Sequence, residues 1–197
     1  MQVLRDNQPS NSAKRSVVTI GAYDGVHRGH QAVIGQVRKE AQQLGCQSVV
    51  VTFDKHPASV VRPASAPKLL TDLDQKLELL QQTGIDATLI VEFNRERSTE
   101  DPALFVKRVL VDTLRAQVVV VGEDFHFGFN RGGNVAMLRE LGKQFDFQVE
   151  PVKLIARPDG VEEPVSSTSI RRALAGGQVE IATNLLGRAY EMRGVVV

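Results

Sequence analysis

The sequence lacks the features of several large protein classes. Its 197 residues include one cysteine, Cys46, so no disulfide can form within the chain and we expect a reducing, cytoplasmic setting. No apolar run approaches the roughly 20 residues that a membrane-spanning helix requires. The first 15 residues contain no apolar stretch and do not resemble a signal peptide. These absences favour a soluble, intracellular protein with no membrane partner.

An excess of one charge is also absent. Lysine and arginine number 24 and aspartate and glutamate 23, a net charge of +1, which argues against a general nucleic-acid-binding protein. Hydrophobic residues make up 42% and charged residues 24%, so the chain as a whole is not disordered. The P-loop, the G-x-G-x-x-G fingerprint and the G-x-S-x-G elbow are all missing. The sequence therefore does not favour a P-loop kinase or an ordinary dinucleotide dehydrogenase.

Apolar, β-branched runs recur at long intervals. They do not alternate with polar residues, so we expect strands that are buried on both faces, as in a parallel sheet. The strong runs are residues 17–20, 48–53, 87–91 and 118–121, and a weaker one covers 147–152.

Helical patterns fill the intervals between these runs. Strand and helix alternate in this way in a parallel α/β sheet with helices on both faces. Two more short helical patterns follow residue 167, and residues 57–67 form a proline-rich loop. The expected helix boundaries are the end at Gly45, the cap at Thr71 with a stop at Gly84, the cap at Ser98 or Thr99, and the cap at Asn134.

The chemistry-bearing residues gather where the predicted strands end. All four histidines, His27, His30, His56 and His126, lie in turns that directly follow a strand. In an open parallel sheet, ligands bind at the carboxyl ends of the strands. The histidines therefore predict a ligand site at this edge.

The first of these turns combines glycines with two histidines. Gly21, Gly25 and Gly29 are spaced by four, which lets the backbone approach a ligand closely. The turn leads into a helix, whose first N–H groups and positive dipole end form an anion site. His27 and His30 are three residues apart, so in the opening turn they share a face. Two imidazoles beside a helix N-terminus can donate hydrogen bonds to a phosphate and to the charge that develops in phosphoryl or nucleotidyl transfer.

Structural explanations compete with these functional ones. Two histidines three apart could be half a zinc site, although Cys46 sits at the start of a strand, away from them. Asp24 could be only a turn residue, and His126 a cap or a surface residue. The cluster at 166–169 begins a helix, and it could also grip a phosphate together with Arg171.

The run from Gly21 to His30 resembles the G-x-F-D-G-x-H-x-G-H motif of the nucleotidyltransferase superfamily. The fuller pattern resembles the FMN adenylyltransferase (FAD synthetase) module of prokaryotic bifunctional riboflavin kinase/FAD synthetase. The resemblance covers nearly all of the chain from residue 16 onward. The matching stretches, in order, are residues 21–30, 52–57, 121–128, 165–171, 185–190 and 194–196.

This resemblance implies a Rossmann-like fold of the HxGH nucleotidyltransferase type. It implies a flexible segment over residues 1–15, an FMN adenylyltransferase domain over 16–186, and the start of a missing riboflavin kinase domain over 187–197. The parent chain would carry that C-terminal kinase domain, so this chain is not expected to phosphorylate riboflavin.

The implied reaction is adenylyl transfer from ATP to FMN, giving FAD and pyrophosphate without a covalent enzyme intermediate. Magnesium would enter with ATP, held by phosphates and not by a dedicated protein site. The implied catalytic residues are His27, His30 and Arg171. The implied ATP-binding residues are Gly21, Ala22, Tyr23, Asp24, Gly25, His27, Gly29, His30, Ser167, Thr168 and Arg171. The implied FMN-binding residues are Phe53, Lys55, His56, Pro57, Asp124, Phe127 and Gly128, with an aromatic ring for stacking on the flavin.

Two residues depart from the family pattern. Lys55 stands where proline is usual, which frees the backbone before His56 and adds a charge, and Tyr23 replaces phenylalanine. Two alternatives stay open. One is another HxGH transferase that uses pantetheine phosphate, nicotinamide mononucleotide or a polyol phosphate. The other is a flavin-nucleotide binding module without turnover.

Overall fold

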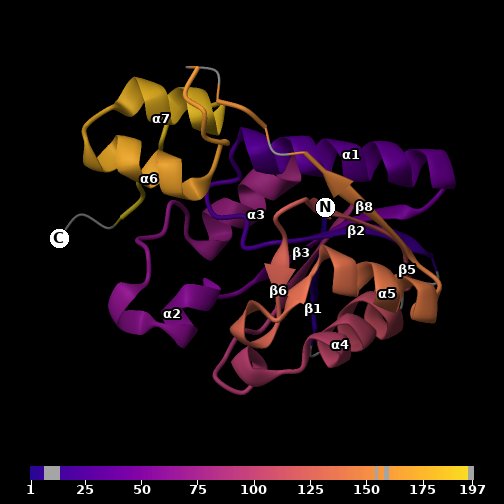
Figure 1. The fold of residues 1–197 in the computed structure, drawn as a ribbon. Coiled ribbons are helices and arrows are strands. Elements are labelled where there is room, and N and C mark those ends of the chain that lie inside the picture. Colours follow the sequence, from indigo (N-terminus) through magenta and orange to yellow (C-terminus); the bar gives the residue numbers. More distant parts are fainter. Residues whose placement is uncertain (7–13, 154, 158–159, 195–197) are drawn as a thin grey trace.

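The computed structural model describes residues 1–6, 14–153, 155–157 and 160–194. Six parallel strands form one sheet in the order β1-β4-β3-β2-β5-β8 (Figure 1). A two-stranded antiparallel sheet, β6 (His126–Phe127) with β7 (Gly133–Asn134), lies in the connection after β5. The bounds of the main strands are β1 (Gln2–Arg5), β2 (Ser16–Ile20), β3 (Gln47–Phe53), β4 (Ala87–Val91), β5 (Ala116–Gly122) and β8 (Gln148–Val152).

Helices cover both faces of the sheet, so the predicted α/β architecture is confirmed. On one face, α1 (Arg28–Leu44) and α3 (Leu73–Gln82) pack on the sheet through residues such as Val37 and Leu80. On the other face lie α4 (Pro102–Phe105), the π-helical segment η3 (Val106–Thr113) that continues it, and α5 (Val135–Phe145). Successive residues of β2 serve opposite faces, with Val17 in one core cluster and Val18 in the other.

A third, separate core joins the last two helices. Helices α6 (Ser167–Ala175) and α7 (Val179–Leu186) lie side by side in Figure 1. Ile170 and Leu185 are fully buried between them, and Leu70, from the loop before α3, packs on the same cluster. This contact brings the α6–α7 pair to the carboxyl end of the sheet.

The N-terminal segment differs from the expectation. Residues 1–15 were predicted to be flexible, but residues 2–5 form β1 and pair with β4 at the edge of the sheet. Asp6 then forms an ion pair of 2.9 Å with Arg108 of η3. A four-residue strand is too short to show a pattern in the sequence, and its partner is more than 80 residues away. Residues 7–13 lie outside the described residues.

Several local boundaries also differ. Asp72, and not Thr71, caps α3 through a capping box with Gln75. Asp101, and not Ser98 or Thr99, caps α4. The predicted proline-rich loop contains α2 (Pro57–Val61) and η1 (Pro63–Ser65). The remaining short helices are η2 (Arg97–Thr99) and η4 (Phe129–Arg131).

The predicted ends at Gly45 and Gly84 and the cap at Asn134 agree with the structure. Gly45 and Gly84 have φ of 64° and 76°, which favour glycine, and Asn134 accepts a hydrogen bond from the Met137 N–H. The last three residues of the segment expected to begin a kinase domain, 195–197, lie outside the described part. Among the described residues, no helix is both long and apolar enough to cross a membrane.

Candidate active site

The sheet order brings the predicted site residues to one edge. Strand β2 lies between β3 and β5. From β2 the chain continues to β3 and β4 on one side of the sheet and later returns to form β5 and β8 on the other side. The turns after these three strands therefore meet at the carboxyl end, where such a switch of direction creates a crevice. They carry the three histidine-bearing stretches that the sequence singled out.

The turn after β2 is strained. Tyr23 and Val26 have φ of 51° and 38°, which is unusual for residues that carry a Cβ. The Tyr23 hydroxyl is buried and lies 2.7 Å from the Thr19 hydroxyl. Gly25 has φ of 80°, and a Cβ there would lie 2.8 Å from the Leu70 side chain. The surrounding structure thus holds this turn in a conformation that it would not adopt alone.

The two histidines of the turn lie stacked at the start of α1. His27 caps the helix, and its Nδ1 accepts a hydrogen bond of 3.3 Å from the His30 N–H. The ring centroids are 3.6 Å apart. Burial lowers the pKa of His27 to about 4, although the nearby Asp24 charge opposes this shift. Because Nδ1 is an acceptor, the proton of the neutral His27 ring sits on Nε2.

His30 has an unusual polar environment. Burial lowers its pKa well below the ordinary value, and the charges of His27 and Lys76 lower it further. Its Nδ1 is buried, and it has no hydrogen-bond partner within the described residues. Buried ring nitrogens normally have a partner. At neutral pH both histidines are therefore uncharged rings able to donate or accept hydrogen bonds.

The buried carboxylate of Asp24 connects the turn after β2 to two other segments of the chain. The carboxylate accepts hydrogen bonds from the N–H groups of Leu70 and Thr71, at 3.0 and 3.1 Å, and from the Thr71 hydroxyl. It also forms an ion pair with Arg171 of α6. The side chain of Asp24 is only 5% exposed. The residue predicted to bind ATP thus directs its carboxylate at protein donors from the loop before α3 and from α6.

Arg171 and the start of α6 lie against the same turn. Besides Asp24, the Arg171 guanidinium donates from Nε to the Lys68 carbonyl at 2.6 Å. The Ser167 hydroxyl donates to the Asp24 carbonyl at 2.9 Å, whereas Thr168 is exposed. A Cβ on Gly29 would lie 3.2 Å from the Val165 carbonyl. The N-termini of α1 and α6 therefore converge, and both favour an anion.

The turn after β3 carries the first group of predicted FMN-binding residues. His56 is half-buried and caps α2, its Nδ1 accepting from the Ala58 N–H at 3.1 Å, with Pro57 as the first helical residue. Burial lowers its pKa. Lys55 is exposed, and its backbone N–H, which proline would lack, donates to Asp54 at 2.7 Å. Lys55 therefore stabilises this turn through its backbone.

The turn after β5 carries the second group. Asp124 and Gly128 are exposed, but Phe127 is only 8% exposed and lies in the core. Its ring is stacked 5.5 Å from that of Phe125, so Phe127 does not offer the open ring expected for flavin stacking. His126 is exposed and lies 2.7 Å from the Asp124 carbonyl, as the surface alternative had it.

Sequence reasoning missed two cations at this edge. Lys76 of α3 is 8% exposed, and Arg188 donates to the carbonyls of Gly25 and Val26 at 2.8 and 3.4 Å. Lys76 lies three residues after Leu73 and four before Leu80, on the apolar stripe of the helix. A lysine on an apolar stripe is a signal that could have been used. Arg188 offers no such signal.

Metal-site geometry is not found among the described residues, where no three His, Cys, Asp or Glu side chains could hold an ion together. Cys46 directs its thiol at Gln117, 3.2 Å away at the start of β5, which is the opposite end of the sheet.

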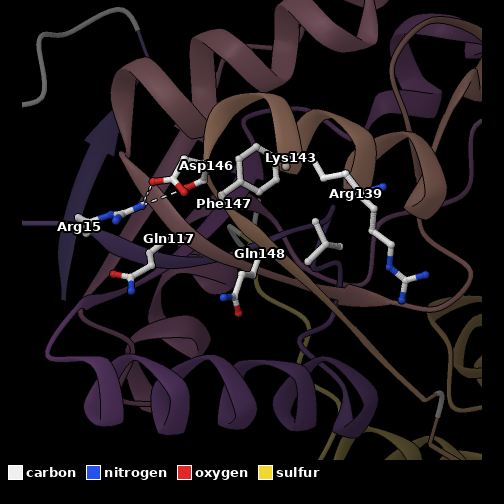
Figure 2. Close-up of a pocket in the computed structure, with 9 residues that line it drawn as sticks. Arg15, Gln117, Arg139, Lys143, Asp146, Phe147 and Gln148 are labelled. Carbon is white, nitrogen blue, oxygen red and sulfur yellow. Dashed lines mark hydrogen bonds and ion pairs between the residues drawn. The ribbon is translucent and has the colours of Figure 1, made fainter.

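A hollow of about 480 Å³ opens at that opposite, amino end (Figure 2). Figure 2 shows Arg15 paired with Asp146 on one side and the side chains of Arg139 and Lys143 on the other. We call it the amino-end hollow. Its lining residues are Arg15, Gln117, Arg139, Gly142, Lys143, Asp146, Phe147, Gln148 and Val149. It contains none of the predicted site residues.

Solved structures share this fold. A macrolide-efflux protein from Streptococcus pneumoniae matches 96% of this chain and 61% of its own, with a TM-score of 0.80 at 24% identity. Pantothenate synthetase from Thermus thermophilus matches 93% of this chain and 80% of its own, with a TM-score of 0.53 at 16% identity. At these identities the likeness concerns the fold alone.

Sequence relatives are more informative. Bifunctional riboflavin kinase/FMN adenylyltransferase from Pseudomonas fluorescens is 40% identical over 181 residues, covering 92% of this chain and 57% of its own length. The Haemophilus influenzae protein of the same name is 33% identical over 198 residues, covering 100% of this chain and 63% of its own. This chain thus spans about three fifths of their length. The FAD synthetase family model matches residues 9–169. The chain with the stacked histidine pair at the start of α1 therefore belongs to the FAD synthetase family.

Proposed function

We propose that this chain transfers the adenylyl group of ATP to FMN. A phosphate oxygen of FMN attacks the α-phosphorus of ATP, the bond from that phosphorus to the β-phosphate bridging oxygen breaks, and pyrophosphate leaves with FAD as product. The observation that carries the proposal is the stacked, uncharged His27–His30 pair at the point where the N-termini of α1 and α6 converge. Catalysis then rests on positioning and charge stabilisation, with no covalent intermediate.

The histidines bind phosphate oxygens as neutral donors. The Nε2–H of His27 is available because its Nδ1 is occupied by the His30 N–H. Neutral imidazoles stabilise the negative charge that develops during the transfer without needing to lose a proton first. Gly21, Ala22 and Gly25 pass beneath the nucleotide, where the turn leaves its backbone close to the ligand.

The start of α6 binds the phosphates that leave as pyrophosphate. Ser167 and Thr168 supply hydroxyls and N–H groups, and Arg171, positioned by Asp24, supplies a charge. Magnesium would be supplied with ATP as the Mg-ATP substrate and would neutralise part of the phosphate charge. The turns after β3 and β5, with His56 and Asp124, line the FMN side.

The relatives are named for two activities, and this chain spans only part of their length. We propose that their riboflavin kinase activity belongs to the part that this chain does not cover. Riboflavin offered with ATP should then remain unphosphorylated.

A chromatographic assay of the purified chain with FMN, ATP and Mg²⁺ tests the proposal. We expect FAD and pyrophosphate to form in equal amounts, and both to be lost when His27 and His30 are changed to alanine. Turnover of pantetheine phosphate, nicotinamide mononucleotide or a polyol phosphate in place of FMN would indicate a different HxGH transferase. Tight flavin binding without FAD formation would indicate a binding module.

A further inference from the structure

Lys76 connects the ends of two adjacent strands. It projects from the buried face of α3, and its Nζ donates to the Phe53 carbonyl at 2.8 Å and to the Ala22 carbonyl at 3.3 Å. Phe53 is the last residue of β3, and Ala22 lies just beyond the end of β2. The ammonium group therefore sits at the carboxyl edge of the sheet, between the predicted FMN and ATP sides.

The two carbonyl acceptors do not satisfy all the hydrogen-bond donors of the Lys76 ammonium group. An ammonium has three N–H donors, and among the described residues no carboxylate lies within ion-pair distance of Lys76. Asp24 and Asp54 act on it only through space, while the Asp24 carboxylate is already bound by Arg171 and the 70–71 backbone. A buried cation without an ionic partner is costly, so the fold retains a positive charge here that it does not itself neutralise.

The other cations at this edge differ from Lys76 in their exposure. Arg171 is bound to Asp24 and the Lys68 carbonyl, and Arg188 to two carbonyls of the glycine turn. Lys55 is exposed. Lys76 is the buried one among these cations, and its third N–H has no partner among the described residues.

The surroundings of Lys76 identify what it faces. Its positive charge lowers the pKa of His30, after the larger effects of burial and of His27, and it also lowers that of His56. The charge of Lys76 therefore acts on His30, on the predicted ATP side, and on His56, on the predicted FMN side. The buried, unpartnered Nδ1 of His30 is a second unsatisfied group in the same place. An anion between the two nucleotide sides would complement the charge of Lys76.

We infer that Lys76 is a substrate-contacting, catalytic cation, whose third N–H donates to phosphate oxygen where the FMN phosphate meets the α-phosphate of ATP. This inference rests on the proposed adenylyl transfer. The attacking phosphate and the α-phosphate are both negatively charged, and a fixed cation between them reduces their repulsion and stabilises the charge of the transition state. The competing explanation is that Lys76 is only a structural clip between two carbonyls.

Three substitutions separate these explanations. Lys76→Met removes the charge at similar length, Lys76→Gln keeps N–H donors without charge, and Lys76→Arg keeps the charge. We expect Lys76→Met and Lys76→Gln to lower kcat for FAD formation about 100-fold, and Lys76→Arg to restore much of it. Lys39→Met, on the exposed side of α1, is the matched control and should leave kcat unchanged. A Lys76→Gln variant as active as Lys76→Arg, or an unchanged kcat in Lys76→Met, would show that the residue is only a clip.

A pH profile provides a readout that a clip would not move. Burial lowers the pKa of Lys76 to about 8, against the opposing charges of Asp24 and Asp54. His30 and His56, which face it from α1 and the start of α2, have lowered pKa values and are uncharged well below pH 8. We expect wild-type kcat to fall as the pH rises through about 8 and the Lys76→Arg profile to stay level there. Identical profiles would overturn the inference, and this comparison needs only the arginine variant to fold.

Failure of the proposed function would be visible separately. If the wild-type chain forms no FAD, adenylyl transfer is wrong, and ligand binding then decides the role of Lys76. Thermal shifts with inorganic pyrophosphate, Mg-ATP and FMN should be present in the wild type and in Lys76→Arg and lost in Lys76→Met. Equal shifts in all three would overturn the contact with phosphate.

Discussion

The two ends of the sheet differ in how far their charged side chains are exposed to solvent. At the amino end, the hollow of Figure 2 carries Arg139 and Lys143, and the paired side chains of Arg15 and Asp146 are 43% and 99% exposed. At the carboxyl end, Asp24, His27 and Lys76 are less than a tenth exposed. The hollow thus lies among exposed charges, and the buried polar groups lie at the other end.

This difference shows why the presence of a hollow does not by itself locate the site. Exposed charges are solvated and cost the fold little, so they say less about a ligand than buried ones do. Buried charges and a strained turn cost stability, and they persist where the surrounding structure enforces them. Buried, incompletely partnered groups are accordingly the better guide to chemistry in this molecule.

The largest expected effect follows from removing a carboxyl-end histidine. His30→Ala should lower kcat for FAD formation by about 100- to 1,000-fold, because a donor to the transition-state phosphate is lost. The KM for ATP should change much less. Steady-state kinetics on the purified chain measure both. An unchanged kcat would show that His30 takes no part in the reaction. Burial of polar groups at the carboxyl end would then not indicate the active site.

The next effect concerns Arg171 and its exposed neighbour. Arg171→Ala should raise the KM for Mg-ATP about tenfold, because a charge-assisted contact with phosphate is lost. It should also lower the free energy of unfolding by about 3 kcal/mol, because Asp24 stays buried without its ionic partner.

Arg172→Ala is the matched control for this change, because Arg172 is 65% exposed and pairs with Glu163 on the surface. It should leave KM unchanged and shift stability by less than about 1 kcal/mol. If Arg171→Ala moved the KM for FMN alone, α6 would have to be reassigned to the flavin side.

A smaller effect is expected in the pH dependence of stability. The folded pKa of His27 is about 4, below the ordinary 6.5, so between these values the unfolded chain binds a proton that the folded chain excludes. Stability should therefore fall as the pH drops from 6.5 towards 4, by about 3 kcal/mol from this residue. Denaturant unfolding of the wild type and of His27→Asn, which keeps a helix cap, measures the difference. If the free energies of unfolding of the two proteins changed in parallel with pH, burial of the His27 ring would not be the cause of the pH dependence.

The smallest effect is expected at the amino-end hollow. Arg139→Ala and Lys143→Ala remove exposed cations, so stability should change by less than about 0.5 kcal/mol and FAD formation by less than about twofold. Activity measurements on the two variants and on the double variant test this. A large loss of activity would make the hollow part of the functional machinery.

Much of the fold was predictable because its signals are local. The β-branched runs, the glycine stops at 45 and 84, and the cap at Asn134 each depend on neighbouring residues, and each agrees with the structure. The segment at 2–5 was missed because its stability comes from β4, far along the chain. The start of α3 was displaced by one residue, because Thr71 serves Gly25 and Asp24 instead.

The sequence by itself determined the parallel α/β class, the histidine-bearing turn and, through its motif, the family. Periodicity and glycine spacing are short-range properties that need no knowledge of distant contacts. Only the tertiary structure decided how charge is distributed at the site. It paired Asp24 with Arg171 from 147 residues away, buried Phe127, and left Lys76 between two strand ends. Burial and pairing depend on which segments meet, and no local pattern specifies that.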